Sequence, residues 1–335
     1  MGYRIGFDIG STTIKAVVLD ENNQICYKSY ERHKAQVRQK ALDKLVELKK
    51  YTKEPFKFAI SGSGALGLCE QGELPFVQEV FASATGVSKL YPETDCAIEL
   101  GGEDAKILFF QGSVEQRMNS TCAGGTGAFI DQMSTLLNMS LEEMNEASLN
   151  YHRLYPIASR CGVFAKTDIQ PLINQGVDKC DLCASIFQAV VDQTITSLAQ
   201  GRKIEGNILF LGGPLYFMSG LRKRFVETLK LSDVQVNCPE TAINFVALGT
   251  AICADQEYTY DELYKALEDL VHAPAKLTES KPLFESEEDY QKFIGRHKSH
   301  DAKYAQLKDY LGKAYLGIDS GSTTTKLVLL DENDA

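Results

Sequence analysis

Several features that would assign this 335-residue chain to other classes of protein are missing. No apolar run is long enough to cross a bilayer, and the start, MGYRIGFDIG, lacks the basic residues and apolar core of a signal peptide. The same start lacks the Ser or Thr of a myristoylation site. The net charge of -10 disfavours nucleic acid or an anionic membrane as the main partner. We therefore expect a cytoplasmic protein with no nucleic-acid and no membrane partner.

The cysteines do not form the pattern of a disulfide-stapled protein. There are nine of them, and an odd count in a long chain disfavours a secreted disulfide framework. We expect most of them to be small buried apolar residues. Cys180 and Cys183 form a CxxC pair, but no second CxxC completes a tetrahedral metal site. Their spacing also suits two cysteines near the start of a helix, which is the interpretation that we favour over a redox or metal pair.

The common single-loop nucleotide motifs are missing too, because the chain contains neither GxxxxGK[ST] nor GxGxxG. Instead, three Gly-rich turns follow apolar strands: DIGSTTIK (8–15), ELGGEDAK (99–106) and FLGGPLYF (210–217). Such turns present backbone N–H groups that can hold phosphate oxygens. Each alone also suits an ordinary hairpin or tight turn, but their order and spacing together predict one phosphate site spread over several turns.

The surrounding pattern predicts an alternating α/β chain. Apolar, β-branched runs predict strands, and helical spacing without breakers predicts helices. The expected strands are 3–9, 14–20 and 234–237. The segment 56–64 is expected to be a strand ending in a Gly-rich loop, 96–110 a strand, Gly turn and strand, and 207–217 a buried strand running into a Gly-Gly-Pro turn. The expected helices are 34–50 (exposed and Lys-rich), 126–137, 183–200, 221–230 and 240–254.

Residue types in the turns suggest individual roles. Asp8 suits Mg²⁺, held through water because this ion keeps several waters. A carboxylate among Glu103 and Asp104 can orient an attacking water beside a triphosphate. The flat glycine surface of the third turn suits adenine or ribose. The expected phosphate- and nucleoside-binding residues are Gly10, Ser11, Thr12, Thr13, Lys15, Gly101, Gly102, Gly212, Gly213 and Pro214.

This set of turns resembles the actin, Hsp70 and sugar-kinase superfamily. In that fold, two RNase H-like subdomains hold ATP in the cleft between them, two hairpin turns grip the phosphates and a later GG turn grips adenosine. The segments Asp8 to Lys15, Glu99 to Lys106 and Gly212 to Pro214 match these parts in order.

Two cysteine motifs narrow the resemblance. STCAGGTGAFIDQM (120–133) places Cys122 before a helix, and SRCGVFAKTDI (159–169) contains Cys161. Both resemble motifs of the ATP-dependent activators of 2-hydroxyacyl-CoA dehydratases, which are related to the ATPase subunits of benzoyl-CoA reductases. The resemblance covers about 1–255. It implies that Cys122 and Cys161 bind a [4Fe-4S] cluster shared across a homodimer, because two thiolates per chain cannot supply the four that a cluster needs. Gly125, Thr126 and Gly127 would then approach the nucleotide.

The sequence departs from that family in two places. Its second phosphate turn usually reads DIGGQD, whereas this chain has Glu99 and Glu103 in place of Asp and Gln. The added charge could weaken phosphate binding or change the hydrolysis rate. An aromatic residue and an Arg that often follow the segment 60–64 are absent.

A repeat organises the rest of the chain. YLGIDSGSTTTKLVLLD (315–331) repeats YRIGFDIGSTTIKAVVLD (3–20) with Asp319 in the place of Asp8. We expect an activase domain at 1–255 (subdomains at about 1–110 and 111–255), a charged helical linker at 256–313, and at 314–335 the first hairpin of a truncated second ATPase domain in a longer tandem protein. An alternative is a terminal strand that pairs back or swaps with a partner.

The expected function is ATP-dependent electron delivery to a 2-hydroxyacyl-CoA dehydratase- or reductase-like iron–sulfur partner, with ATP or ADP, Mg²⁺ and a [4Fe-4S] cluster. The cluster would be held by a homodimer or by a pseudo-dimer with the second domain. The alternatives are a small-molecule, sugar-type kinase of the same fold and a non-catalytic nucleotide sensor. The kinase would need an Asp base for a hydroxyl acceptor, which the sequence does not show.

Overall fold

The computed structural model describes residues 2–119, 124–159, 162–274, 282–298, 301, 304, 308, 310–320 and 324–332. The chain divides into two compact units, Met1–Pro274 and Ala275–Ala335. Among the described residues, the first unit contains two five-stranded sheets, and the second contains helix α12 and a two-stranded hairpin.

The first sheet of unit 1 has the strand order β10-β4-β1-β2-β3. Strand β1 is central: it pairs antiparallel with β2 through a tight hairpin and parallel with β4 on its other side. The expected strands 3–9 and 14–20 are confirmed. β3 was not predicted, because its alternating polar residues ICYKSYER contain no apolar run and lie at a sheet edge. The bounds are β1 Arg4–Ile9, β2 Thr13–Leu19, β3 Ile25–Arg32, β4 Phe56–Ser61 and β10 Glu257–Tyr258.

The second sheet has the order β7-β6-β5-β8-β9 and repeats this topology except at one edge, where β9 pairs parallel with β8 while β10 pairs antiparallel with β4. Strand β5 pairs antiparallel with β6 through the second Gly-rich turn and parallel with β8, which leads into the third. The two sheets therefore place their hairpin turns at equivalent positions. The bounds are β5 Cys96–Leu100, β6 Ala105–Phe109, β7 Glu115–Met118, β8 Ile208–Leu211 and β9 Val236–Asn237.

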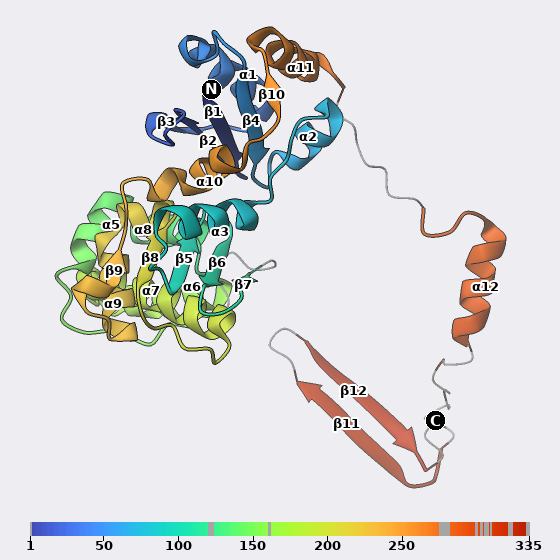
Figure 1. Ribbon diagram of the computed structural model, residues 1–335. Coiled ribbons are helices and arrows are strands. Elements are labelled where there is room, and N and C mark those ends of the chain that lie inside the picture. The colour runs from blue at the N-terminus through green and yellow to red at the C-terminus, as the bar shows by residue number, and fades with distance from the viewer. Residues whose placement is uncertain are drawn as a thin grey trace. The chain divides into compact units, whose positions relative to one another are not determined.

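Helices cover both sheets and separate them (Figure 1). Helices α3 and α10 pack on each other between the two sheets, where Val87 and Phe245 join side chains of β2, β5, β6 and β8 in one apolar cluster. The helices of unit 1 are α1 Val37–Glu47, α2 Leu66–Gly72, α3 Glu79–Leu90, α4 Gly127–Leu137, α5 Leu141–Ser148, α6 Gly162–Asn174, α7 Lys179–Thr194 with a π-helical extension Ile195–Ala199, α8 Gly213–Phe217, α9 Ser219–Leu229, α10 Phe245–Cys253 and α11 Tyr260–His272, with short 3-10 turns at Lys49–Tyr51, Asp233–Gln235 and Ala242–Asn244.

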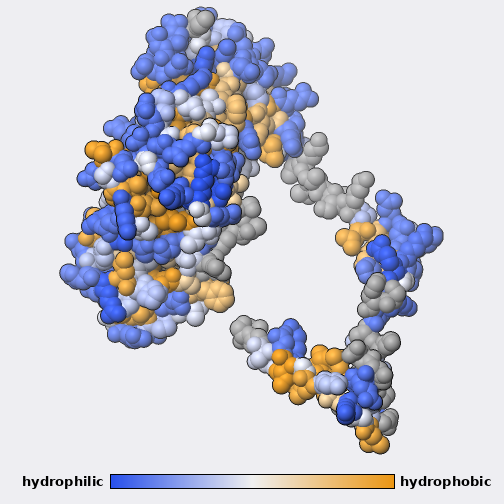
Figure 2. Space-filling model, turned by 60° about the horizontal axis from the view of Figure 1, so that its bottom comes forward, coloured by the Kyte–Doolittle hydropathy of each residue, from blue (hydrophilic) through white to orange (hydrophobic). Residues whose placement is uncertain are grey.

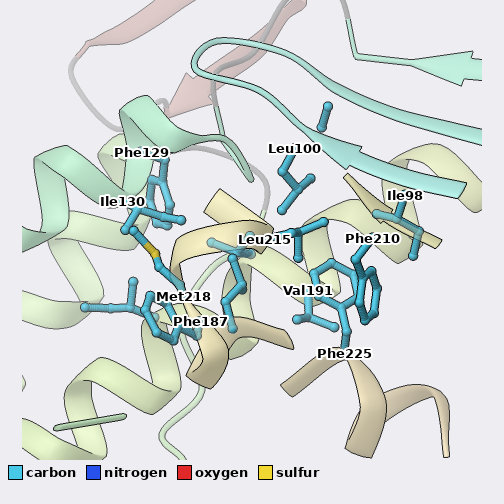
Figure 3. Packing of buried hydrophobic residues seen from close by; sticks show 14 of the residues in the cluster. Ile98, Leu100, Phe129, Ile130, Phe187, Val191, Phe210, Leu215, Met218 and Phe225 are labelled. Carbon is cyan, nitrogen blue, oxygen red and sulfur yellow. The ribbon is translucent and has the colours of Figure 1, made fainter. Parts of the chain in front are cut away.

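Each sheet has its own core. Figure 3 shows the core of the second sheet, where Val191 of α7 lies beside Phe210 of β8 and Phe225 of α9, and Phe187 of α7 lies beside Met218. In the first sheet, Leu42 and Leu45 of α1 lie in the core, so the helix predicted at 34–50 exists but is exposed on one face only.

Strand β10 and helix α11 lie within the range 256–313 that we expected to be linker, and both pack on the first sheet. β10 pairs with β4, and Leu263, Leu267 and Leu270 of α11 are each at most 3% exposed in that core. The Arg38 side chain donates hydrogen bonds to the carbonyls of Leu270 and Ala273, which holds the end of α11 to α1.

Unit 2 contains α12 Glu287–Lys298 and a hairpin of β11 Ala314–Ser320 and β12 Thr325–Asp331. Asp319 stands opposite Lys326 in this hairpin, as Asp8 stands opposite Lys15 in unit 1. Apolar side chains of both strands are exposed, including Ile318 and Leu327, and Figure 2 shows hydrophobic residues in orange along the hairpin.

One helix among the described residues, Lys179–Ala199, passes a length and hydropathy test for a membrane span. The core helix of a soluble protein passes the same test, and 72% of the apolar window of this helix is buried in the protein.

Candidate nucleotide site

The first hairpin turn carries a buried ion pair. Lys15 Nζ lies 2.7 Å from Asp8 Oδ2, and the two residues face each other across β1 and β2. Burial alone would lower the pKa of Lys15, but the charge of Asp8 and its hydrogen bond raise it above the ordinary value. Lys15 is therefore a fixed positive charge beside a carboxylate. One oxygen of Asp8 is engaged by the lysine, which suits a water-mediated rather than a direct role toward Mg²⁺.

The second hairpin repeats the arrangement with more charges. Glu99 stands opposite Lys106, whose Nζ lies 3.5 Å from Glu99 Oε1 and 2.8 Å from Asp104 Oδ2 and also binds Glu79 of α3. Burial opposes the charge of Lys106, but the three carboxylates raise its pKa well above the ordinary value. One buried cation thus holds together a strand end, a turn and the first residue of α3.

Glu99 is the most buried of these carboxylates, with 7% of its surface exposed. Burial raises the pKa of Glu99 more than the charge of Lys106 lowers it, and the charges of Asp104 and Glu79 raise it further. The Ser83 hydroxyl donates a hydrogen bond of 3.1 Å to Glu99. The sequence pattern did not identify Glu79 or Ser83 as partners, since α3 is far from the turn along the chain.

The first and second turns face each other. A Cβ added to Gly102 would lie 3.3 Å from Thr12 Oγ1, so the first and second turns approach within side-chain contact. Ser11, Thr12 and Glu103 are exposed, whereas Thr13 is 8% exposed. The exposed hydroxyls are therefore available to a ligand.

Gly127, the first residue of α4, lies between the second and third Gly-rich turns. A Cβ on Gly127 would lie 3.2 Å from the Gly101 carbonyl and 3.3 Å from Pro214. The N–H groups of Gly127 and Ala128 donate hydrogen bonds to the carbonyls of Gly101 and Gly102, so the start of α4 is fastened to the second turn. Thr126 is completely buried there.

The third turn requires glycine. Gly212 has φ +87°, and a Cβ there would lie 2.0 Å from the Leu100 carbonyl. The adjacent Gly213 faces Tyr30 of β3, whose hydroxyl lies 3.9 Å from the position of a Gly213 Cβ. Tyr30 also packs edge-on against Phe217 of α8, at 6.3 Å between ring centroids. The expected nucleoside surface is thus bordered by two aromatic rings that the sequence patterns did not identify.

Cys122 and Cys161 lie outside the described residues, but their flanking residues come together. Gly124, Gly125, Ser159 and Gly162 line the same small cavity of about 10 Å³, with Phe129, Ala158, Ala189 and Gln193. The described residues that follow Cys122 and those that flank Cys161 therefore lie close together. Within the described residues, no three His, Cys, Asp or Glu side chains are arranged to hold a metal ion.

Cys180 and Cys183 occupy the first turns of α7. Cys183 is fully buried beside Met139, and burial raises the pKa of its thiol to about 12. The pKa of the Cys180 thiol is also raised, mainly by burial and then by the hydrogen bond and charge of Asp178. A reactive redox pair needs a lowered thiol pKa, so the geometry agrees with two cysteines at helical spacing near a helix start.

Comparisons with known proteins agree with this architecture. The chain is 28% identical over 258 residues to an activator of lactoyl-CoA dehydratase from Anaerotignum propionicum, which covers 75% of this chain and 97% of that protein. It is 27% identical over 256 residues to the (R)-2-hydroxyglutaryl-CoA dehydratase activating ATPase of Acidaminococcus fermentans, covering 75% of this chain and 96% of that protein.

Solved structures confirm the predicted fold. The activator of the 2-hydroxyisocaproyl-CoA dehydratase from Clostridium difficile, with bound ADPNP, superimposes with a TM-score of 0.66 at 25% identity and covers 81% of this chain and 98% of that chain. The fold is thus the predicted α/β fold of the actin, Hsp70 and sugar-kinase type. The predicted resemblance is confirmed as well, since residues 5–254 match the family, and the chain belongs to the BadF/BadG/BcrA/BcrD ATPase family.

Proposed function

We propose that this chain is an ATP-dependent iron–sulfur activator that delivers an electron to a 2-hydroxyacyl-CoA dehydratase- or reductase-like partner. The main support is the position of Gly127. This residue contacts the second and third Gly-rich turns, and it is the first residue of α4, the helix that follows Cys122 in the sequence. Relatives of the chain are named as activators of such dehydratases, and another, from Thauera aromatica, is named as one of the subunits of benzoyl-CoA reductase.

The nucleotide part of the proposal assigns the turns of unit 1. Lys15 and the N–H and hydroxyl groups of residues 10–13 hold phosphate from one side, and Gly101, Gly102 and Asp104 hold it from the other. Asp8 orients a water of the Mg²⁺ ion, and Gly212, Gly213 and Pro214 face adenosine. Glu103, exposed at the tip of the second turn, orients the attacking water. The close approach of Gly102 to Thr12 supports this assignment, because the first and second turns can then contact the same phosphate chain.

The cluster part of the proposal assigns Cys122 and Cys161 as ligands. Support comes from the shared cavity, because it is lined by Gly124, which comes soon after Cys122 in the chain, and by Ser159 and Gly162, which come before and after Cys161. A [4Fe-4S] cluster takes four thiolates, so two chains or two domains must contribute. When bound, the cluster supplies one-electron transfer. The hairpin 314–331 supports a second domain, because its Asp319–Lys326 pairing copies the register of Asp8 and Lys15.

Coupling between the two parts follows from the start of α4. The Gly101 and Gly102 carbonyls accept hydrogen bonds from the first N–H groups of α4. If the second turn moves when the nucleotide's phosphate is released, these hydrogen bonds would move the start of α4 and the segment that precedes it. Adding ATP is expected to change the EPR signal or midpoint potential of the reduced, iron-loaded protein, and an unchanged signal and potential would contradict the coupling.

The nucleotide assignment is tested by titrating Mg²⁺ and ADP into the full chain. Gly127→Val places a side chain against the Gly101 carbonyl and Pro214, and such overpacking typically costs about 1–3 kcal/mol. We expect ADP affinity to fall by about tenfold or more. Gly67→Val is the matched control, because nothing lies within 4 Å of a Cβ at Gly67. Equal losses in both variants would contradict the assignment.

A further inference from the structure

A buried histidine holds the first phosphate turn from behind. His33 follows β3 and is only 4% exposed. Its backbone N–H donates to the Thr12 carbonyl at 3.2 Å, and its ring Nε2 lies 3.0 Å from the Gly10 carbonyl oxygen. One residue thus contacts two carbonyls of the four-residue turn that the sequence identified as phosphate-binding.

The contact of the other ring nitrogen, Nδ1, determines which tautomer of His33 fits the structure. The Ala35 N–H donates to His33 Nδ1 at 3.2 Å, so Nδ1 must carry a lone pair. The proton of the neutral ring is then on Nε2, which donates to Gly10. A doubly protonated ring could not accept from Ala35. The contact geometry therefore selects a single tautomer.

The backbone after His33 is shaped to make this contact. Lys34 and Ala35 have φ values of 48° and 62°, although left-handed backbone is unfavourable for residues with a Cβ. The Gln36 N–H closes the turn on the His33 carbonyl at 2.8 Å. These two strained residues direct the Ala35 N–H back toward the His33 ring. Strained backbone of this kind is often found at functional sites.

The orientation of one peptide follows from these contacts. In a planar trans peptide, the C=O and the following N–H point in opposite directions, and the described residues contain no cis bond. Because His33 holds the Gly10 carbonyl on one side, the Ser11 N–H points to the other side. Ser11 is exposed, so this donor is presented away from the protein core.

We propose that His33 is a positioning residue for the nucleotide: as the Nε2–H tautomer it orients the Gly10–Ser11 peptide so that Ser11 N–H donates to phosphate. This inference rests on the proposed nucleotide site, and it assigns a role to a residue outside the Gly-rich turns.

The first arm of the test measures the wild-type chain without nucleotide. The full chain labelled with ¹⁵N-histidine is examined by NMR, with His33→Gln identifying the signal of residue 33. The expected result is a neutral ring with a protonated Nε2 and an unprotonated Nδ1. A protonated Nδ1, in either the other neutral tautomer or the imidazolium, overturns the proposal.

The second arm separates the two ring nitrogens. A glutamine amide can occupy the place of Nε2 and donate to Gly10, an asparagine amide reaches only the place of Nδ1, and phenylalanine keeps the shape without either. We expect the affinity for Mg²⁺ and ADP to fall about five- to tenfold in His33→Asn and His33→Phe, and His33→Gln to recover most of it. His297→Asn, on the exposed helix α12, is the control.

The outcomes distinguish this inference from the proposed function. Wild-type affinity in His33→Asn and His33→Phe overturns the role of His33 while leaving the nucleotide site intact. A purely structural histidine would lower thermal stability in the three variants without separating Gln from Asn in ADP affinity, and that result also overturns the proposal. No ADP binding by the wild type would refute the proposed function instead, and with it the phosphate role of His33.

Discussion

Lys15 Nζ lies 2.7 Å from Asp8 Oδ2, and the two residues stand opposite each other on β2 and β1. The same residue pair recurs in the hairpin of unit 2, where Lys326 Nζ lies 3.3 Å from Asp319 Oδ2. In unit 1 the pair is largely buried, whereas in unit 2 both side chains are exposed. Of these two ion pairs, only Asp8–Lys15 is shielded from water. Removing one of its charges would therefore leave the other charge buried and unpaired.

The first prediction concerns Lys15→Met. This change leaves the buried Asp8 without its partner, which should cost about 1–3 kcal/mol of unfolding free energy and weaken the binding of Mg²⁺ and ADP. Chemical denaturation and calorimetry measure the two effects. The double variant Asp8→Asn, Lys15→Met should recover part of the stability but not the binding. Lys28→Met, which removes an exposed lysine from the next strand, should change neither property, and unimpaired binding in Lys15→Met would contradict the role of this lysine.

The second prediction concerns the buried charges around Lys106. Lys106→Met leaves Glu79, Glu99 and Asp104 without their common cation, and breaking a buried ion pair in this way costs about 3–5 kcal/mol. Lys292→Met, which breaks an exposed pair with Glu288 in α12, is the control and should stay within about 1 kcal/mol of the wild type. A loss in Lys106→Met as small as in the control would contradict the arrangement.

The third prediction is a pH dependence at Glu99. Burial raises the pKa of Glu99 above its ordinary value of 4.5, so the folded state binds this proton more tightly than the unfolded state. Stability that depends on the protonated form is present at low pH and is lost as the pH rises above about 4.5. Relative to the wild type, Glu99→Gln should therefore gain in unfolding free energy between pH 4 and pH 7. A stability difference that stays constant or falls across this range would contradict the direction of the shift.

The fourth prediction concerns the extent of the folded domain. A chain that ends at residue 274 should fold and bind ADP like the full chain, because β10 and α11 complete the first sheet. A chain that ends at residue 255 loses three leucines that are at most 3% exposed, and burying each contributes about 1.5–3 kcal/mol. We expect it to unfold at much lower denaturant concentration, and equal stability of the two truncated chains would be the contrary result.

The local patterns of the sequence were sufficient to predict the two central hairpins and the three turns. Asp8 lies near the end of β1, and Gly101 and Gly212 directly follow β5 and β8, so the position of each turn at a strand end could be predicted from neighbouring residues. The range 256–313 was expected to be a charged helical linker, and the packing of α11 on the first sheet was not predicted, although Thr259 and Glu262 form a capping box and Leu263, Leu267 and Leu270 follow helical spacing. Its many charged residues favoured a solvated linker over a helix with one buried face.

The contacts behind the turns could not be predicted in this way. Glu79 reaches Lys106 across 27 residues, and His33 reaches Gly10 across 23 residues. Such pairs depend on how α3 and β3 pack against the sheets, which no local spacing encodes. The same limit applies to Tyr30, which borders the third turn only because β3 is folded beside it.

The proposed electron transfer depends on an iron–sulfur cluster held by Cys122 and Cys161. Its decisive test is the content of iron and acid-labile sulfide in anaerobically purified protein, beside Cys122→Ala, Cys161→Ala and, as a control, Cys180→Ser, Cys183→Ala. We predict about four iron and four sulfide per dimer in the wild type and in the control, and loss of both in the first double variant. Absence of iron from the wild type after reconstitution, or its retention without Cys122 and Cys161, would contradict the assignment of these two cysteines.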